Sequence, residues 1–158
     1  MTTVFAEHRF LLSNDQLDIT PGVAVTNYTD FGTQLFPGVD ISYALSEALR
    51  IYGNVGYTYR IPTFTDLYYS DSTTLGNEDL KPEEALTEEL GLRLIINNFQ
   101  FSAAAFLRQA ENLIDYIRPT EEGRFEATNV REVNTHGVEL EAKTQFKELF
   151  NMSVNTTD

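Results

Sequence analysis

The sequence predicts an all-β fold, an antiparallel up-and-down meander of about eight strands. Three observations favour this fold class. Apolar and polar residues alternate along most segments, short and long connections alternate along the chain, and two of the segments are long. Alternation with a period of two gives a strand one apolar face and one polar face. The expected strands cover residues 3–12, 16–27, 36–46, 49–60, 83–96, 99–118, 124–147 and 151–158.

The clearest strand is "GVELEAKTQF", in which apolar side chains fall on one face and charged side chains on the other. The apolar set is Val138, Leu140, Ala142 and Phe146, and the polar set is Glu139, Glu141, Lys143 and Gln145. Only "KPEEALTEELGLRL" also suits a helix, which Pro82 could open. The alternating leucines and Gly91 favour a strand there instead.

The connections between the strands are of two kinds. Those at 13–15, 47–48, 97–98 and 148–150 are tight, whereas those at 28–35, 61–82 and 119–123 are longer. In an up-and-down sheet alternate connections lie at the same end, so one end is trimmed and the other is elaborated. Transmembrane barrels of outer membranes are built in this way.

Strand length points in the same direction. Residues 99–118 and 124–147 exceed the five or six residues that are typical of globular strands. A tilted strand needs about 9–11 residues to cross the apolar layer of a membrane, and the excess can stand above it. The strands therefore favour part of a larger transmembrane β-barrel over a soluble sandwich.

Composition excludes several classes of function. The 158 residues suit a single domain, and 11 Lys and Arg against 24 Asp and Glu give a net charge of −13. No basic stripe is available for nucleic acid. The absence of cysteine excludes a disulfide, a thiolate nucleophile and a Cys-ligated metal. The sequence contains no run of 18 apolar residues, so no transmembrane helix is predicted. The first residues, "MTTVFAEHRFLL", do not look like a secretory signal.

Several motifs resemble those of one known family, and they occur in that family's order. "YRIPTFTDLYY" followed by "GNEDLKPEE" is similar to a pattern of TonB-dependent outer-membrane receptors. "NLIDYI", "ATNV" and "HGVELEAK" resemble that family's next hairpin, and "GVAVTNYTDFG" before "FPGVDISYAL" resembles the preceding pair. Together the motifs span most of the chain. "LIDYI" and the short Leu-Tyr loop look most like the cobalamin-receptor branch, although ferric-siderophore receptors share the scaffold.

The resemblance implies that residues 1–158 form a single, partial β-barrel domain of such a receptor. Family barrels have roughly 22 strands, and neither the family's plug domain nor its aromatic-ended last strand is recognisable in the sequence. The implied function is capture of a scarce nutrient, of the cobalamin or ferric-siderophore class, for TonB-driven import. The implied location is the outer membrane, with lipid around the barrel and TonB reached only through the plug.

The resemblance also singles out residues of the long connection. Its motif positions, expected to be structural, are Arg60, Pro62, Leu67, Gly76, Asn77, Leu80, Pro82, Glu83, Gly137 and Glu139. Pro62 restricts Ile61 to extended geometry, and Gly76 with Asn77 is expected to supply a positive φ that reverses the loop. The candidate ligand-binding residues of this extracellular loop are Tyr68, Tyr69, Asp71 and Asp66.

No cofactor, metal site or catalytic function is predicted. The loop acids lack the spacing of a calcium-binding loop, and His8 and His136 are isolated. Glu139 and Glu141 share a strand face, which formally suits acid–base work on a glycan, but no cleft accompanies them. We therefore expect a protein that is not an enzyme.

One alternative fold remains open, a soluble small-ligand-binding β-barrel or sandwich whose apolar faces point inward. The membrane interpretation instead predicts that the isolated chain self-associates through open sheet edges.

Overall fold

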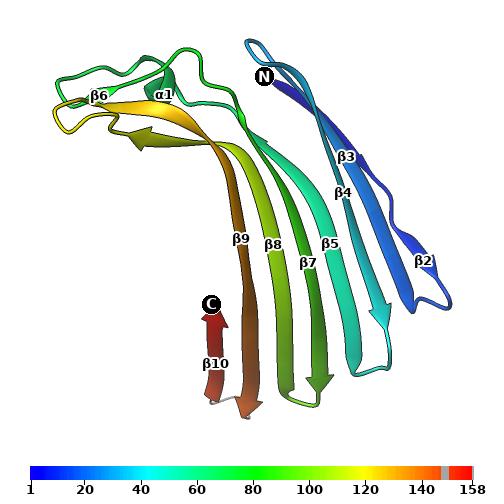
Figure 1. The fold of residues 1–158 in the computed structure, drawn as a ribbon. Coiled ribbons are helices and arrows are strands. Elements are labelled where there is room, and N and C mark those ends of the chain that lie inside the picture. The colour runs from blue at the N-terminus through cyan, green and yellow to red at the C-terminus, as the bar shows by residue number, and fades with distance from the viewer. Residues whose placement is uncertain (147–149, 158) are drawn as a thin grey trace. The chain divides into compact units, whose positions relative to one another are not determined.

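A computed structural model describes residues 1–146 and 150–157 of the chain. Its elements are β1 (Thr2–Glu7), β2 (Phe10–Leu12), β3 (Leu17–Tyr28), β4 (Gly32–Ala44), β5 (Leu49–Arg60), α1 (Phe64–Tyr68), β6 (Thr74–Leu75), β7 (Glu83–Ile96), β8 (Phe99–Ile117), β9 (Phe125–Phe146) and β10 (Phe150–Thr157) (Figure 1). The described residues include no helix with the length and apolarity needed to cross a membrane.

The strands form one open sheet in the order β1-β3-β4-β5-β7-β8-β9-β10, with β2 paired to β3 and β6 paired to β9. Apart from β2 and β6, neighbours in the sheet are also neighbours in the chain. The predicted up-and-down meander is therefore confirmed. The β6–β9 pair is parallel, and it adds a short strand from the long connection to the sheet.

Each of the eight predicted strands is present, and the helix considered after Pro82 is wrong, since β7 occupies those residues. The predicted first strand is interrupted between β1 and β2. The pairing of Glu7 with Gly22 and of Phe10 with Ile19 shows that the register is the same on both sides of the gap. The gap lies opposite Pro21, which cannot donate a hydrogen bond to a neighbouring strand.

One predicted connection is wrong. Residues 28–35 were expected to be a long loop, but β4 begins at Gly32 and only residues 29–31 connect β3 to β4. Gly32 has a φ of +72° and pairs with Tyr28, so the turn closes at once and the alternation continues through Leu35. The tight connection expected at 148–150 falls largely on residues 147–149, which lie outside the described residues.

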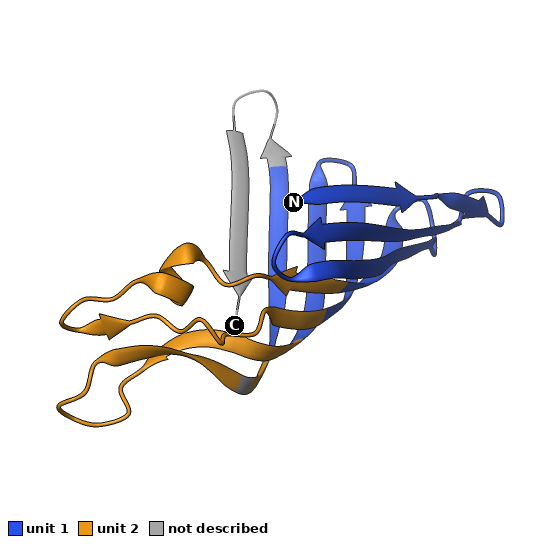
Figure 2. Cartoon of the chain, turned by 90° about the horizontal axis from the view of Figure 1, so that it is seen from above, with its two compact units in different colours: residues 1–56, 87–108, 135–158 blue, residues 57–86, 109–134 orange. Residues whose placement is uncertain are grey.

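Close contacts divide the chain into two compact units (Figure 2). Unit 1 comprises residues 1–56, 87–108 and 135–158, and unit 2 comprises residues 57–86 and 109–134. Unit 2 holds both of the long connections, at 61–82 and at 118–124, together with the strand ends that lead into them. That the chain is a single domain remains a prediction.

Among the described residues of unit 1, the apolar side chains do not enclose a core. Tyr43 pairs with Ile51 across β4 and β5, and Val39 pairs with Val55. Ile51 and Val55 are 39% and 40% exposed, and Leu90 of β7 is 65% exposed. This apolar exposure is the reverse of what the soluble barrel or sandwich requires, and it suits a sheet that faces lipid.

The other face of unit 1 is polar. The Arg50 guanidinium donates to Ser42 Oγ at 2.8 Å. The Tyr52 ring covers Gly91, where any β-carbon would collide with it, and the Arg93 guanidinium lies 5.7 Å from the ring centroid. Gly91 therefore serves to seat an aromatic ring, a role that its strand position alone does not reveal.

The apolar core of the described residues lies in unit 2. It consists of Leu80, Ala85, Ala110 and Ala127, each at most 5% exposed. Two carboxylate residues, Asp66 and Glu83, are buried in the same unit. A buried carboxylate is costly unless it is hydrogen-bonded or paired with a positive charge, so the partners of these two residues determine how unit 2 is held together.

Candidate functional site in the long connection

An ion pair closes the long connection at its base. Arg60 is the last residue of β5, and Glu83 is the first residue of β7. The guanidinium donates from Nε and Nη2 to the two Glu83 oxygens, at 2.6 and 2.5 Å. The Ile114 amide of β8 donates to Glu83 Oε1 at 2.8 Å. Two-point pairing of this kind fixes orientation as well as distance, so the ends of three strands are held in one arrangement.

Asp66 is the second buried carboxylate, and it organises helix α1. Thr63 caps the helix, because its side chain accepts from the Asp66 amide while Asp66 Oδ2 accepts from the Thr63 amide at 2.9 Å. Asp66 Oδ1 accepts from the Tyr116 hydroxyl at 3.1 Å, and the Arg60 guanidinium lies 3.7 Å from Oδ2. Burial alone raises the pKa of Asp66. The hydrogen bonds from Thr63 and Tyr116 and the charge of Arg60 lower this pKa by a larger amount, so its net shift is downward.

The chain returns under helix α1 through Gly76 and Asn77. The Gly76 amide donates to the Tyr69 carbonyl at 2.6 Å, and the Asn77 amide donates to the Asp66 carbonyl at 2.8 Å. The expected positive φ is wrong, since neither residue has one. Glycine is required at 76 for a different reason, because a β-carbon there would lie 2.8 Å from the Leu67 carbonyl oxygen. The constraint is close packing of backbone on backbone.

Beyond this return, the connection is bonded along β9. Thr74 and Leu75 of β6 pair with Phe125 and Glu126, and the Phe125 amide donates to the Thr73 carbonyl at 2.8 Å. Farther along, Asn77 Nδ2 donates to the Ala127 carbonyl at 3.2 Å. The side-chain amide of Asn77 thus extends the row of hydrogen bonds along β9 beyond the last backbone pair of β6.

Asn129 of β9 extends the same ladder by one more step. Its Oδ1 accepts from the Lys81 amide at 2.8 Å, and its Nδ2 donates to the Lys81 carbonyl at 2.9 Å. The same Nδ2 donates to the Asn112 carbonyl of β8 at 2.7 Å. Asn112 has a φ of +54°. Sequence reasoning noticed "ATNV" as a motif but assigned Asn129 no role, because its partners are remote in the chain.

An aromatic surface remains exposed on the connection, formed by Phe64, Tyr68 and Tyr69, which are 77%, 52% and 46% exposed. The Phe64 and Tyr68 rings, four residues apart on α1, have their centroids 5.0 Å apart. Sequence reasoning named the two tyrosines but missed Phe64. The helical spacing of Phe64 and Tyr68 is the signal that could have found it.

Asp71 shapes the turn that follows the aromatic surface. Its Oδ1 accepts from the amides of Thr73 and Thr74 at 2.7 and 2.6 Å, and its Oδ2 accepts from the Tyr69 hydroxyl at 2.9 Å. These bonds, the Thr73 amide first, lower the pKa of Asp71 to about 2. The Arg124 guanidinium donates to Ser70 Oγ and to the Asp71 carbonyl, each at 3.2 Å, so the turn is also tied to the start of β9.

The motif residues fall into two groups. All of them except Gly137 and Glu139 lie in unit 2, where Pro62, Leu80 and Glu83 are buried. Gly137 and Glu139 lie in the unit 1 part of β9, where Glu139 pairs with Thr157 of β10. The loop motif residues therefore belong to one unit, and the β9 motif residues belong to the other.

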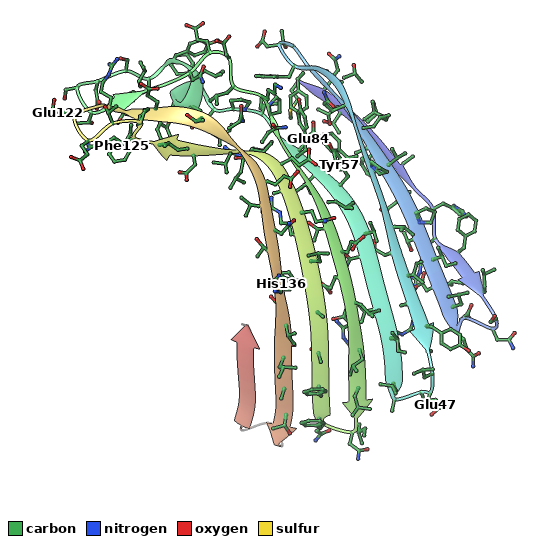
Figure 3. All side chains as sticks on the ribbon, viewed as in Figure 1. Glu47, Tyr57, Glu84, Glu122, Phe125 and His136 are labelled. Atoms are coloured by element: carbon green, nitrogen blue, oxygen red, sulfur yellow. The ribbon has the colours of Figure 1, made fainter. Side chains whose placement is uncertain are left out.

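A second polar feature of unit 2 lies outside the long connection. The Tyr57 hydroxyl of β5 donates to Glu84 Oε2 of β7, and the two side chains lie beside each other (Figure 3). They line a hollow with Glu111 and Glu132 from β8 and β9. Across the described part of the chain, no group of three or more His, Cys, Asp or Glu residues is placed to hold a metal ion.

The ion pair at the base of the connection allows a stability test. Arg60→Gln removes both guanidinium hydrogen bonds from the Glu83 carboxylate, which is only 11% exposed. We expect the free energy of unfolding in denaturant to fall by about 1–2 kcal/mol, a figure reduced because the guanidinium is half exposed. The control is Lys143→Gln, because Lys143 is equally exposed but pairs with the more accessible Glu141 at 2.7 Å. Equal losses in the two variants would contradict the burial argument.

Comparison with known proteins adds independent information. A family model described as TonB dependent receptor-like, beta-barrel, matches residues 1–158. The chain is 29% identical over 112 residues to the vitamin B12 transporter BtuB of Vibrio vulnificus, which covers 71% of this chain and 18% of that protein. It is 28% identical over 146 residues to BtuB of Photobacterium profundum, covering 89% and 23%. The chain thus spans about a fifth of the length of these curated relatives.

Solved structures show the same fold. The siderophore receptor PirA from Pseudomonas aeruginosa superposes with a TM-score of 0.82 at 20% identity, covering 98% of this chain and 30% of that one. A variant of the ferric enterobactin receptor PfeA from the same organism gives 0.79 at 18% identity, covering 98% and 26%. Members of this family are outer-membrane proteins of Gram-negative bacteria. The chain belongs to the TonB-dependent receptor family and forms part of its β-barrel.

Proposed function

We propose that these residues belong to an outer-membrane receptor that captures a scarce nutrient and imports it with energy delivered through TonB. The match of the whole chain to the family's barrel carries the proposal. Between the two nutrient classes, vitamin B12 is favoured because the curated relatives, at 28–29% identity, are vitamin B12 transporters. The siderophore receptors are below 25% identity and support only the fold.

The chain would contribute two things to such a receptor. Its apolar strand face would lie against membrane lipid, and its long connection would carry ligand contacts. The aromatic surface is accessible, and aromatic rings offer large contact areas to a bulky ligand. Tyr68 and Tyr69 are therefore the first candidates, with Asp71 beside them. Asp66 is buried and fully hydrogen-bonded, and would contribute through the shape of the loop.

The remaining partners follow from the same proposal. TonB would act through a plug domain, whereas the matched family model covers the β-barrel. The relatives are named as transporters and receptors, and we propose that this protein likewise transports its ligand without catalysing a reaction. The proposal includes no cofactor and no nucleic acid.

Binding of vitamin B12 tests the proposal. Outer membranes that contain the complete gene product are expected to bind radiolabelled vitamin B12, and replacing Tyr68 and Tyr69 together with alanine should weaken binding about tenfold or more. Tyr43→Ala, which removes an exposed tyrosine of β4 in unit 1, is the matched control and should change little.

Ferric enterobactin is measured in parallel with vitamin B12. If the protein binds ferric enterobactin but not vitamin B12, the proposed nutrient changes from vitamin B12 to a ferric siderophore. If it binds neither ligand, the receptor proposal is contradicted. Protein levels in the membrane, compared by immunoblot, separate lost affinity from lost assembly.

We also propose that the isolated 158-residue chain self-associates in water. The strands β1 and β10 stand at the two ends of the sheet order, and the apolar face of unit 1 is exposed. Chemical cross-linking of the chain over a concentration series should show dimers and larger species that increase with concentration. Monomer alone at the highest concentration would contradict this expectation.

A further inference from the structure

The long connection of unit 2 is not built as a mobile loop. Several of its hydrogen bonds lead to residues about fifty positions away in the chain. Examples are Asn77 to Ala127, Lys81 to Asn129, and Arg124 to Ser70. A loop attached in this way loses little conformational entropy when a ligand binds, because it is already ordered.

Two polar residues carry most of the attachment, Asp66, which is buried, and Asn129, which is half-buried. Asp66 joins the end of β5 through Arg60, the helix through Thr63, and β8 through Tyr116. Its carbonyl also receives the amide of Asn77 on the return path. Asp66, only 8% exposed, therefore joins the stretch at residues 60–63 to Asn77 and to Tyr116 of β8.

Asn129 provides the second attachment. Its side chain imitates a peptide group, accepting from Lys81 and donating back to it, in the way that a neighbouring strand would. The β6–β9 pairing and the Asn77 bond precede it along β9. Together they hold the loop along β9 between residues 125 and 129.

The aromatic surface stands on this attached frame. Phe64 and Tyr68 belong to helix α1, whose first turn is held by the hydrogen bonds between Thr63 and Asp66. The carbonyl of Tyr69 accepts a hydrogen bond from the Gly76 amide. Any loosening at Asp66 or Asn129 would therefore be transmitted to the position of these rings. None of the bonds described for Asp66 or Asn129 uses an atom of the three aromatic rings.

We propose that Asp66 and Asn129 are positioning residues, which form the aromatic surface before the nutrient arrives and do not themselves touch it. This inference rests on the proposed receptor function, since it assigns to that receptor the residues that fix its loop in advance. Preorganisation of this kind raises affinity because ordering has already occurred in the free protein.

The test uses the complete gene product in outer membranes. Asn129→Ala is expected to weaken binding of vitamin B12 about tenfold. It should also accelerate hydrogen exchange at the amides of Lys81 and Phe125 in the absence of ligand. The matched control is Asn134→Ala, an exposed asparagine on the same strand in the same unit, which should change neither quantity.

A disulfide distinguishes positioning from direct contact. Thr74 and Phe125 are paired across β6 and β9, and the described chain has no cysteine of its own. Adding Thr74→Cys and Phe125→Cys to Asn129→Ala should restore affinity to within about twofold of wild type when oxidised, but not when reduced. Should Asn129→Ala fail to reach the membrane, Asn129→Asp keeps the oxygen that accepts from Lys81 while losing both donated bonds.

The outcomes separate the two proposals. Unchanged exchange in Asn129→Ala would overturn the attachment, and faster exchange with unchanged affinity would overturn its role in binding. Lost affinity that oxidation does not restore would identify Asn129 as a contact residue and overturn its positioning role. Wild-type protein that binds neither vitamin B12 nor ferric enterobactin contradicts the proposed function alone, because the exchange rates still decide the attachment.

Discussion

The hydrogen-bond ladder along the first five residues of β9 is the constraint on which unit 2 depends. A strand that extends beyond its neighbours presents unpaired backbone groups, and these must find partners. The long connection supplies partners through β6 and through the side chain of Asn77, and the Asn129 side chain of β9 in turn bonds the backbone of Lys81. The same bonds give the connection a fixed path. The length of the connection is thus explained by the strand it has to accompany as well as by the surface it carries.

Buried charge gives this arrangement its specificity. Glu83 and Asp66 would each be costly alone, and both lie within reach of the single guanidinium of Arg60. On β8, the Ile114 amide also donates a hydrogen bond to Glu83, and the Tyr116 hydroxyl donates one to Asp66. Alternative packings of the loop would leave a carboxylate without these partners. We therefore regard the motif around Arg60 and Glu83 as the feature that selects one loop arrangement among many.

The sheet could be predicted from the sequence because its causes are local. Alternation over a few residues, as in residues 138–146, is enough to identify a strand and its two faces. Errors arose where a local signal had two interpretations. The polar stretch after Tyr28 suggested a loop, but Gly32 closes the turn at once. Gly76 suggested a positive φ, but it serves close backbone packing against Leu67.

The site was harder to predict because its causes are remote. Asp66 was predicted as a candidate ligand contact, and only the fold brings Tyr116 and Arg60 to it. Asn129 carried no local signal for its bonds to Lys81. Tyr68 and Tyr69 were identified from their residue type and their place in the long connection, and both are exposed. The exposed side chains could therefore be identified from the sequence, whereas the roles of the side chains that support them could be identified only from the fold.

The central claim is that the long connection and the β8–β9 turn form one ordered body. Spin labels placed through Ser72→Cys and Glu121→Cys, at exposed positions of the two connections, test it directly by pulsed electron–electron distance measurement. In the complete protein without ligand, we expect one narrow distance distribution that added vitamin B12 leaves unchanged. A broad distribution that narrows only when ligand is added would contradict the account.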